Sequence, residues 1–306
     1  MPSPSLPDAV RALIEERSRA REARDWARAD ALRDELAALG WEVQDGPSGS
    51  TARPILAPEA APGPPDRLDE PASVPVSVVL LAEDHPDDLR RALAGLAAHP
   101  SSVEREIVVV ANGASFDVAG LVRDVAPEAL LVEAPERLGW ADAVTLGMRR
   151  AGGAVVALLD TSVEPTGDLI SPLLAAFEDP TVGLAGGWGV TSADARQFTD
   201  APPGEVDAVE GYCLAVRREA LQAVRGFDRR FRFYRNADLD FSFAVRDAGW
   251  RAIRTEPLPA VRHAHRGWES LPDAERDRLS KRNFYRFLDR WRDRPDLLIA
   301  NHEADR

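Results

Sequence analysis

The sequence of 306 residues is poor in cysteine, lysine and long apolar runs. Cys213 stands alone, so no disulfide can form within the chain, and a reducing compartment is indicated. Lys281 is the only lysine among 38 basic residues, so a single arginine carries little functional information. Apolar runs such as Val76–Ala82 and Ala154–Leu159 have the length of strands, well below the roughly 18 residues of a membrane-spanning helix.

A positive net charge is also missing. Lys and Arg number 38 against 51 Asp and Glu, which gives a formal charge of −13. A protein that coats DNA or RNA needs a positive field, so this balance argues against that class, although it allows a local basic groove. Residues 1–10 lack the basic and apolar segments of a signal peptide. We therefore expect a soluble, cytoplasmic protein without a transmembrane segment.

Composition divides the chain into three parts. Residues 1–53 predict a helical hairpin, because no glycine occurs from Leu6 to Leu39 and Asp25 can cap a second helix. Seven prolines and few large apolar residues between 54 and 75 predict an extended, mobile linker. Residues 76–306 form the main domain.

Within the main domain, apolar runs rich in β-branched residues alternate with amphipathic helices. This pattern predicts an α/β fold with a mostly parallel sheet that is covered on both faces. The expected strands are 76–82, 106–111, 130–132, 154–159 and 182–186, and the expected helices are 87–98, 116–126, 140–151, 167–177 and 273–291. Because ligands bind beyond the carboxyl ends of such strands, we expect the site near residues 82–85, 111–115 and 160–164.

The N-terminal part carries a run of short motifs at fixed spacing. They are Glu15–Arg17, Ala20–Arg21, Asp25–Ala27, Ala29–Asp30 and Leu32–Leu36, and the stretch ends at Asp45–Ser50. Over residues 13–51 the chain resembles the C-terminal tail of bacterial cysteinyl-tRNA synthetases, which would imply a tRNA contact. Residues 1–54 nevertheless hold 8 Arg against 10 acidic residues, whereas an RNA-binding hairpin should be basic. Charge therefore favours the alternative, a hairpin used for packing or for a protein partner.

The main domain carries a longer set of motifs over residues 76–292. They are Val76–Leu81, Glu106–Gly113, Arg137–Ala141, Leu158–Val163, Gly211–Arg217, Gly226–Asp228, Phe231–Tyr234, Asp238–Asp240, Ala248–Trp250 and Val261–His265. In this order and spacing they resemble family 2 glycosyltransferases of the GT-A fold, a Rossmann-like mixed sheet. The resemblance implies an inverting enzyme that transfers a sugar from a nucleotide-diphospho-sugar donor to a hydroxyl of a glycan or small-molecule acceptor.

The same resemblance assigns roles to individual residues. Asp238 takes the place of the general base that deprotonates the acceptor hydroxyl. Asp160 matches the first acid of an Asp-x-Asp motif that holds Mg²⁺ or Mn²⁺, and His263 and His265, which would face the same way on a strand, complete the metal set. The nucleotide-sugar-binding residues are Ala82, Glu83, Asp84, Asn112, Gly139 and Asp160. The acceptor-side residues are Tyr234, Asp240 and Trp188.

Three acids of the family pattern are replaced in this chain. Ser162 stands in place of the second metal-binding acid, Ala111 in place of a nucleotide-reading Asp, and Ala237 in place of the Glu of an acidic pair. These losses leave a second function open, a GT-A domain without catalysis that acts as a binding or scaffold protein and docks a partner through the hairpin. A tRNA-linked factor is a third hypothesis.

Structural roles for the candidate residues also stay open. Asp160 can cap a turn, and Asp238 and Asp240 can be acids in the first turn of a helix, where the helix dipole favours them. Both histidines can be surface residues. Glu83 and Asp84 add negative charge where the negative nucleotide-sugar donor would bind. Either a metal ion offsets this charge, or the chain has lost donor binding.

Overall fold

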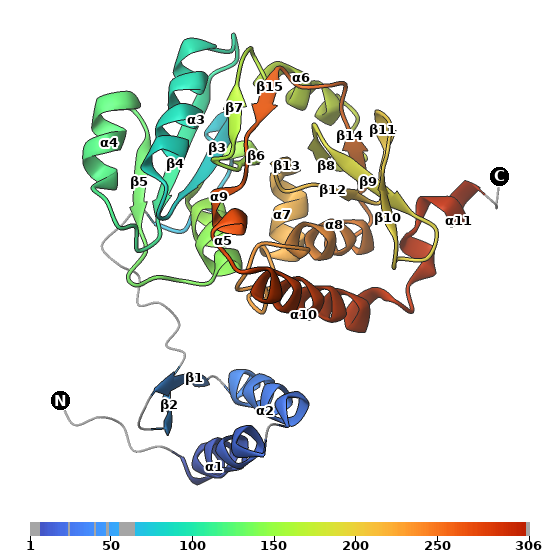
Figure 1. Ribbon diagram of the computed structural model, residues 1–306. Helices are drawn as coiled ribbons and strands as arrows, with labels where there is room; N and C mark the ends of the chain where they lie inside the picture. Colours follow the sequence, from blue (N-terminus) through green and yellow to red (C-terminus); the bar gives the residue numbers. More distant parts are fainter. Residues whose placement is uncertain (1–6, 24, 40, 47–48, 55–64, 304–306) are drawn as a thin grey trace. The chain divides into compact units, whose positions relative to one another are not determined.

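The computed structural model describes residues 7–23, 25–39, 41–46, 49–54 and 65–303. The chain divides into two compact units, Met1–Ala61 and Pro62–Arg306, and each is described by itself. Figure 1 shows the elements of both units.

The N-terminal unit contains two helices followed by a β-hairpin. Its elements are α1 (Asp8–Glu22), α2 (Trp26–Ala38), β1 (Trp41–Gly46) and β2 (Gly49–Pro54), with β1 and β2 antiparallel. The side chain of Asp25 accepts a hydrogen bond from Arg28 N and starts α2 as an N-cap. Val10, Leu36 and Val43 form the centre of a small core. The predicted helical pair is confirmed, whereas the β-hairpin was not predicted. Within the closing stretch Asp45–Ser50, residues 47–48 lie outside the described residues.

The larger unit is built on a mixed eight-stranded sheet in its described part, with strand order β11-β14-β8-β13-β6-β3-β4-β5. These strands are β3 (Val74–Ala82), β4 (Arg105–Ala111), β5 (Leu130–Glu133), β6 (Gly153–Leu159), β8 (Val182–Gly186), β11 (Gly204–Glu205), β13 (Cys213–Arg217) and β14 (Arg251–Arg254). β3, β4, β5 and β6 run parallel, while β13 is antiparallel to both of its neighbours. The carboxyl ends of β3, β4 and β6 therefore meet at one edge, as the sequence predicts.

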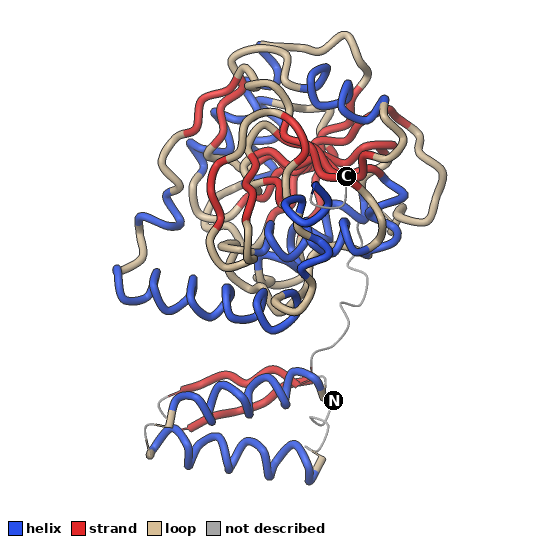
Figure 2. Tube along the Cα trace, turned by 90° about the vertical axis from the view of Figure 1, so that its right-hand side faces the viewer, coloured by secondary structure: helices blue, strands red, loops and turns tan. Residues whose placement is uncertain are grey.

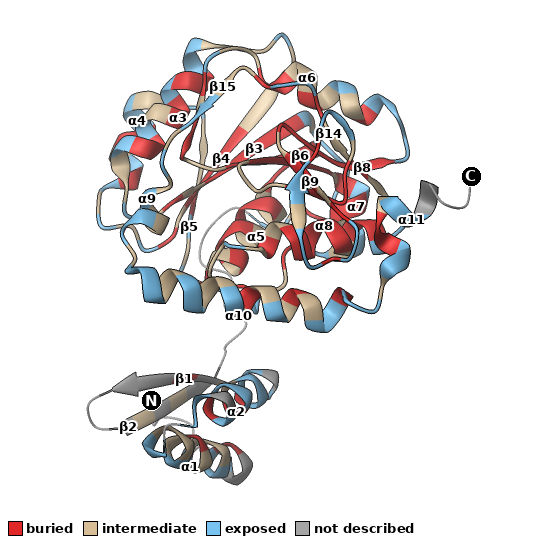
Figure 3. Cartoon of the chain, turned by 45° about the vertical axis from the view of Figure 1, so that its right-hand side comes forward, coloured by how far each residue is buried: buried red, intermediate tan, exposed pale blue. Residues whose placement is uncertain are grey.

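Helices cover both faces of this sheet, and Figure 2 shows the strands gathered between them. One face packs on α3 (Pro86–Ala98), α4 (Val118–Val125) and α6 (Ile170–Ala175), and the other on α5 (Trp140–Arg150), α7 (Arg218–Val224) and α8 (Ala237–Asp247). Both faces of the sheet are apolar because successive side chains of β3 point to opposite faces. Val78 and Leu80 pack in the core on the first face, and Val79 packs in the core on the second. Burial is continuous along the central strands in Figure 3. The predicted α/β fold with a Rossmann-like mixed sheet is confirmed.

Shorter elements complete the unit around the edge where the strands end. The remaining strands are β7 (Val163–Pro165), β9 (Gly189–Ser192), β10 (Phe198–Asp200), β12 (Ala208–Val209) and β15 (Ala260–Arg262). The remaining helices are α9 (Arg266–Glu269), α10 (Asp273–Trp291) and α11 (Ile299–Glu303), with 3₁₀ turns at Ala176–Glu178 and Pro295–Leu297. β9, β10 and β12 form a second small sheet, and β7 pairs with β15.

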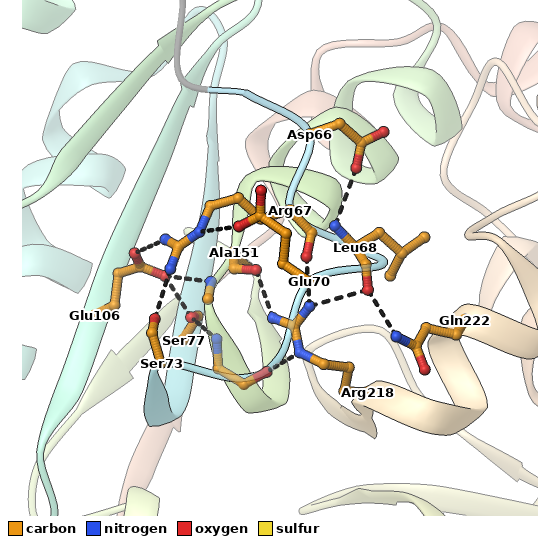
Figure 4. Close-up of polar contacts among 12 residues, drawn as sticks. Asp66, Arg67, Leu68, Glu70, Ser73, Ser77, Glu106, Ala151, Arg218 and Gln222 are labelled. Carbon is orange, nitrogen blue, oxygen red and sulfur yellow. Dashed lines mark hydrogen bonds and ion pairs between the residues drawn. The ribbon is translucent and has the colours of Figure 1, made fainter.

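Residues 66–73, called the strap below, are bound to the main sheet and α7 (Figure 4). Arg218 donates hydrogen bonds to four backbone oxygens, those of Arg67, Leu68, Ala151 and Gly153, and the Leu68 side chain is fully buried. Arg67 in turn pairs with Glu106 at 3.0 Å. The strap falls in the predicted linker 54–75. Of that linker, residues 55–64 lie outside the described residues, while the strap is fixed to the domain because the buried Arg218 of α7 finds two of its hydrogen-bond acceptors in it.

Candidate functional site

Asp160 lies at the carboxyl end of β6 and shapes the turn that follows it. Its Oδ1 accepts hydrogen bonds from Ser162 N at 2.8 Å and from Ser162 Oγ at 2.5 Å. Its backbone N–H donates to Tyr212 O at 3.0 Å, which ties the turn to the segment before β13. Asp160 therefore does cap a turn, and Ser162 uses its hydroxyl for that turn.

His265 faces the other oxygen of the same carboxylate. His265 Nε2 lies 3.5 Å from Asp160 Oδ2, and the imidazole stacks on Tyr234 with ring centroids 4.2 Å apart. Burial by itself would raise the pKa of Asp160, but hydrogen bonds from His265 and Ser162 hold the pKa below its usual value. Burial likewise opposes the charged form of His265, yet the pairing with Asp160 raises the pKa of the imidazole. The two groups form a half-buried ion pair at the sheet edge.

Asp238 lies in the first turn of α8, with its carboxylate buried. It accepts hydrogen bonds from two backbone amides, Gly211 N and Leu239 N, each at 3.0 Å. Burial raises the pKa of Asp238, and the two amides only partly oppose this. Asn236 precedes the helix in a left-handed conformation, with φ at 64°, and Asn283 on α10 holds the loop by donating to Phe233 O and Arg235 O.

A cavity of about 260 Å³ brings the two acids together. Its lining residues are Trp140, Asp160, Val190, Phe198, Asp200, Glu210, Gly211, Tyr212, Tyr234, Arg235, Asn236, Asp238, Leu239 and His265. Segment Glu210–Tyr212 runs between the acids, since Tyr212 O binds Asp160 N and Gly211 N binds Asp238. We call Glu210, Gly211 and Asp238 the acceptor half of the site.

Four of the predicted nucleotide residues, Ala82, Glu83, Asp84 and Asn112, lie at the ends of β3 and β4. Together with Gly139, Arg137 and Asp160 we call them the donor half. Asn112 Nδ2 donates to Glu83 Oε1 at 3.0 Å and to Leu138 O at 3.2 Å, which joins the two strand ends to the loop before α5. Ala82 is the last residue of β3, opposite Ala111. Gly139 is the N-cap of α5, where a Cβ would lie 3.0 Å from the Arg232 side chain.

The acidic pair Glu83–Asp84 is accompanied by a cation. Arg137 Nη2 lies 2.7 Å from Asp84 Oδ2 and 4.0 Å from Glu83 Oε1. The hydrogen bond from Arg137 lowers the pKa of Asp84, whereas burial raises the pKa of Glu83. The local charge is therefore smaller than the sequence suggests. Sequence reasoning missed Arg137 because arginine is the default cation of this chain.

Three of the predicted acceptor-side and metal residues do not line the cavity. Asp240 points to the other side of α8, where Trp291 Nε1 and Arg290 bind it at 2.8 and 3.0 Å, because successive helical residues face different ways. Trp188 packs edge-on against Tyr212, which lines the cavity, but Trp188 is not itself a lining residue.

His263 is the third. β15 ends at Arg262, so His263 and His265 do not share a strand face as predicted, and His263 Nε2 instead meets Glu164 at 2.6 Å.

Other cavity residues were not predicted. Trp140 lies within the motif Arg137–Ala141, and Glu210 directly precedes the motif Gly211–Arg217. These two motifs therefore held the available sequence signal for both residues. Asp200 and Phe198 come from β10, a short strand whose sequence has no apolar run and which sequence periodicity does not reveal.

The donor set for a divalent cation is small. No group of three His, Cys, Asp or Glu residues that could hold a metal occurs within the described part of the chain. Asp160 Oδ2 and His265 Nε2 are 3.5 Å apart, close to the about 3.0 Å between neighbouring ligands that lie about 2.1 Å from a metal in an octahedral site. With the His265 imidazole deprotonated, the pair fits a cation as two protein ligands, and further ligands would come from a bound anion or water.

Residues 77–260 match the model of Glycosyl transferase family 2, and the chain belongs to this family. Two solved structures share its fold. A structure of GalNAc-T7 with UDP, GalNAc and Mn²⁺ has a TM-score of 0.59 at 15% identity, over 73% of this chain and 50% of the other. The mannosyltransferase PcManGT from Pyrobaculum calidifontis, in complex with GDP-Man and Mn²⁺, has a TM-score of 0.52 at 23% identity, over 65% and 62%. The GT-A fold is therefore shown.

Residues 3–53 match the Cysteinyl-tRNA ligase anticodon binding domain. A cysteine–tRNA ligase of Nitratidesulfovibrio vulgaris is 68% identical over 41 residues, which are 13% of this chain and 8% of the ligase. A ligase of Beutenbergia cavernae is 61% identical over 41 residues, 9% of its length. The chain thus spans about a tenth of the curated relatives that it matches. Among the described residues, no helix is both long and apolar enough to cross a membrane.

Proposed function

We propose that the chain is a nucleotide-sugar-dependent glycosyltransferase that inverts the configuration of the transferred sugar. The observation that carries this proposal is that Asp160 and Asp238 line one cavity, although they are 78 positions apart in the sequence. Family membership and the two structural neighbours support it. The donor diphosphate binds in the donor half and the acceptor hydroxyl in the acceptor half.

Asp238 acts as the general base. Burial raises the pKa of its carboxyl, which makes the carboxylate a stronger base, and two backbone amides hold it in place. The base removes the proton from the acceptor hydroxyl as that oxygen attacks the anomeric carbon, and the nucleoside diphosphate leaves. A single displacement of this kind inverts the anomeric centre.

Asp160 and His265 hold Mg²⁺ or Mn²⁺, which stabilises negative charge on the leaving diphosphate when it is bound. Ser162 does not serve as a ligand, because its hydroxyl donates to Asp160. Two protein ligands are too few for tight binding of the ion alone, so Mn²⁺ binding should require a nucleotide. Titration of the protein with Mn²⁺, with and without UDP or GDP, measures this directly, and tight binding of Mn²⁺ alone would contradict it.

Thermal unfolding with a panel of nucleoside diphosphates and Mn²⁺ tests the function. A ligand at about 100 times its dissociation constant adds about 2.7 kcal/mol to the free energy of unfolding, which raises the melting temperature by a readily measured amount. Matching nucleotide sugars should then be consumed in the presence of an acceptor. If no nucleotide raises the melting temperature, the proposal fails.

The second candidate is a GT-A domain that binds without catalysis. The observations that favour it are the replacements at Ala111, Ser162 and Ala237 and the use of the Ser162 hydroxyl inside the turn. Under this hypothesis nucleotides bind but no sugar is transferred, and the Asp238→Asn variant binds a partner as well as the unchanged protein does.

Residues 1–53 act as a separate module that docks a protein partner, joined by the linker 54–75 to the transferase domain 76–306. The acidic balance of residues 1–54 supports a protein partner over tRNA. Filter binding of the full chain to tRNA at two salt concentrations distinguishes them, because an RNA contact through arginines weakens as salt rises.

A further inference from the structure

Glu210 lies beside the proposed base, and its side chain has no assigned role. It lines the same cavity as Asp238 and directly follows β12. Among the residues that the structure describes, none donates a hydrogen bond to the Glu210 carboxylate. Burial raises the pKa of Glu210, and the negative charge of Asp238 raises it further. The Glu210 oxygens are not among the fully buried unpartnered atoms of the described residues, so they face the cavity, where hydrogen-bond donors of a ligand can reach them.

The charges around Glu210 are mostly negative. Asp200 and Asp238 line the cavity with it, and Arg235 and Arg262 are the cations that act on it. Both guanidinium groups are already engaged on aromatic rings, Arg235 over Trp268 at 5.1 Å and Arg262 over Tyr212 at 4.7 Å. Carboxylates therefore outnumber the cations around Glu210 by three to two, which favours a neutral or cationic acceptor over an anionic one.

Gly211 leaves open the space between Glu210 and Asp238. A Cβ at Gly211 would lie 3.7 Å from Asp238 Oδ2, an ordinary contact distance, and the backbone there is not in the left-handed region. Neither strain nor crowding therefore demands glycine at this position. The space stays free for an atom that approaches the Asp238 carboxylate.

We propose that Glu210 determines acceptor specificity by accepting a hydrogen bond from a second hydroxyl or an amine of the acceptor, which makes the acceptor a neutral or amino sugar. This inference rests on the proposed function, because it assigns the acceptor end of the same site. Asp238 takes the proton of the attacking hydroxyl over Gly211, and Glu210 holds the neighbouring group of the sugar. Uronic acids and sugar phosphates are disfavoured by the excess of carboxylates.

The full chain is tested with the nucleotide sugar found by thermal unfolding and with three acceptor pools. The pools are neutral methyl glycosides, amino-sugar glycosides, and uronic acids with sugar phosphates, and products are identified by mass. Products from the first two pools are expected. Products from the anionic pool alone, or none from any pool while nucleotide binding persists, would overturn the role of Glu210. Absence of nucleotide binding would instead overturn the proposed function itself.

Variants of Glu210 separate a specificity role from a structural one. Glu210→Gln should raise the acceptor KM at least about tenfold with kcat changed less than about threefold, and should lower the preference for neutral over anionic acceptors about tenfold. Glu210→Asp, which keeps the charge, should retain the preference. Glu128→Gln, at an exposed turn, is the matched control and should behave as the unchanged protein does. An unchanged preference in Glu210→Gln would overturn the proposal, and the Asp variant decides the matter if the Gln variant does not fold.

Discussion

The donor half and the acceptor half of the site treat their acids in opposite ways. In the donor half each carboxylate has a side-chain partner: Asp84 meets Arg137, Glu83 meets Asn112, and Asp160 meets Ser162 and His265. In the acceptor half, Asp238 is held by backbone amides and Glu210 by none of the described residues.

This difference suggests how the chain tolerates its lost acids. Under the proposed function the donor half receives an anion, and its own negative charges are offset by neighbours on the protein. The acceptor half would then remove a proton, and its carboxylates face the cavity without a side-chain cation bound to them. The replacements at Ala111 and Ser162 fall in the donor half, where charge can be offset, and Asp238 is kept where it cannot.

The largest expected effect comes from Asp238→Asn. An amide cannot accept the proton of the acceptor hydroxyl, so transfer should fall by about 100- to 10,000-fold. Nucleotide binding should change little, since Asp238 belongs to the acceptor half. Initial rates with saturating donor, together with the nucleotide-induced rise in melting temperature, measure both properties, and a variant with unchanged turnover would remove Asp238 as the base.

The pH dependence of the unchanged protein provides a second check on Asp238. The base works in its deprotonated form, and burial raises its pKa, so the transfer rate should fall on the acid side at a pH above the ordinary Asp value of about 3.9. A rate that stays constant down to that value would show that another group, or an unperturbed carboxylate, is responsible.

The next effect is on the donor half. Asp160→Asn removes the charge that faces His265 and a cation, so nucleotide binding in Mn²⁺ should weaken about 100-fold. Asp168→Asn is a matched control, because Asp168 caps a turn in the same way through Ile170 N but lies outside the cavity. Calorimetric titration with UDP or GDP distinguishes the two variants, and an equal loss in both would indicate a structural effect alone.

A smaller effect is expected for Gly211→Ala. The added methyl group would stand 3.7 Å from Asp238 Oδ2, in the space assigned to the attacking hydroxyl. Acceptor turnover should fall about tenfold, while the melting temperature and nucleotide affinity stay near those of the unchanged protein. Full turnover in this variant would show that the acceptor approaches Asp238 from elsewhere.

The smallest effect is expected for Arg137→Ala. Arg137 is exposed, but its removal leaves Glu83 and Asp84 without their cation, so nucleotide affinity should fall about three- to tenfold. The loss should shrink at high salt, because exposed charges are screened. Arg123→Ala on α4 is the control, and an equal loss there would make the effect one of net charge.

Much of the site could be predicted because it depends on motifs at strand ends. The order of strands and helices predicted Asp160 at the carboxyl edge of the sheet, whereas Asp238 was implied by the resemblance to family 2 glycosyltransferases, and the structure places both acids in the lining of one cavity. The separation of His263 from His265 could not be predicted, because β15 ends where His263 N binds Ser162 O, a contact that only the folded chain creates.

Two other features also depend on tertiary contacts. The strap has a linker-like composition, yet Arg218 fixes it through backbone oxygens, which any sequence would offer. The sequence pattern around Glu210 does not single this residue out. Its proposed role follows from its place in the same cavity as Asp238, which comes 28 positions later in the chain.

Segment Glu210–Tyr212 has a further consequence for how such a site can change. Its backbone binds Asp160 through Tyr212 O and Asp238 through Gly211 N. The length of this segment therefore fixes the distance between the two acids. An insertion or a bend in these three residues would misalign donor and acceptor together. New acceptors are therefore most readily gained by exchanging the side chain at position 210, with the backbone left as it is.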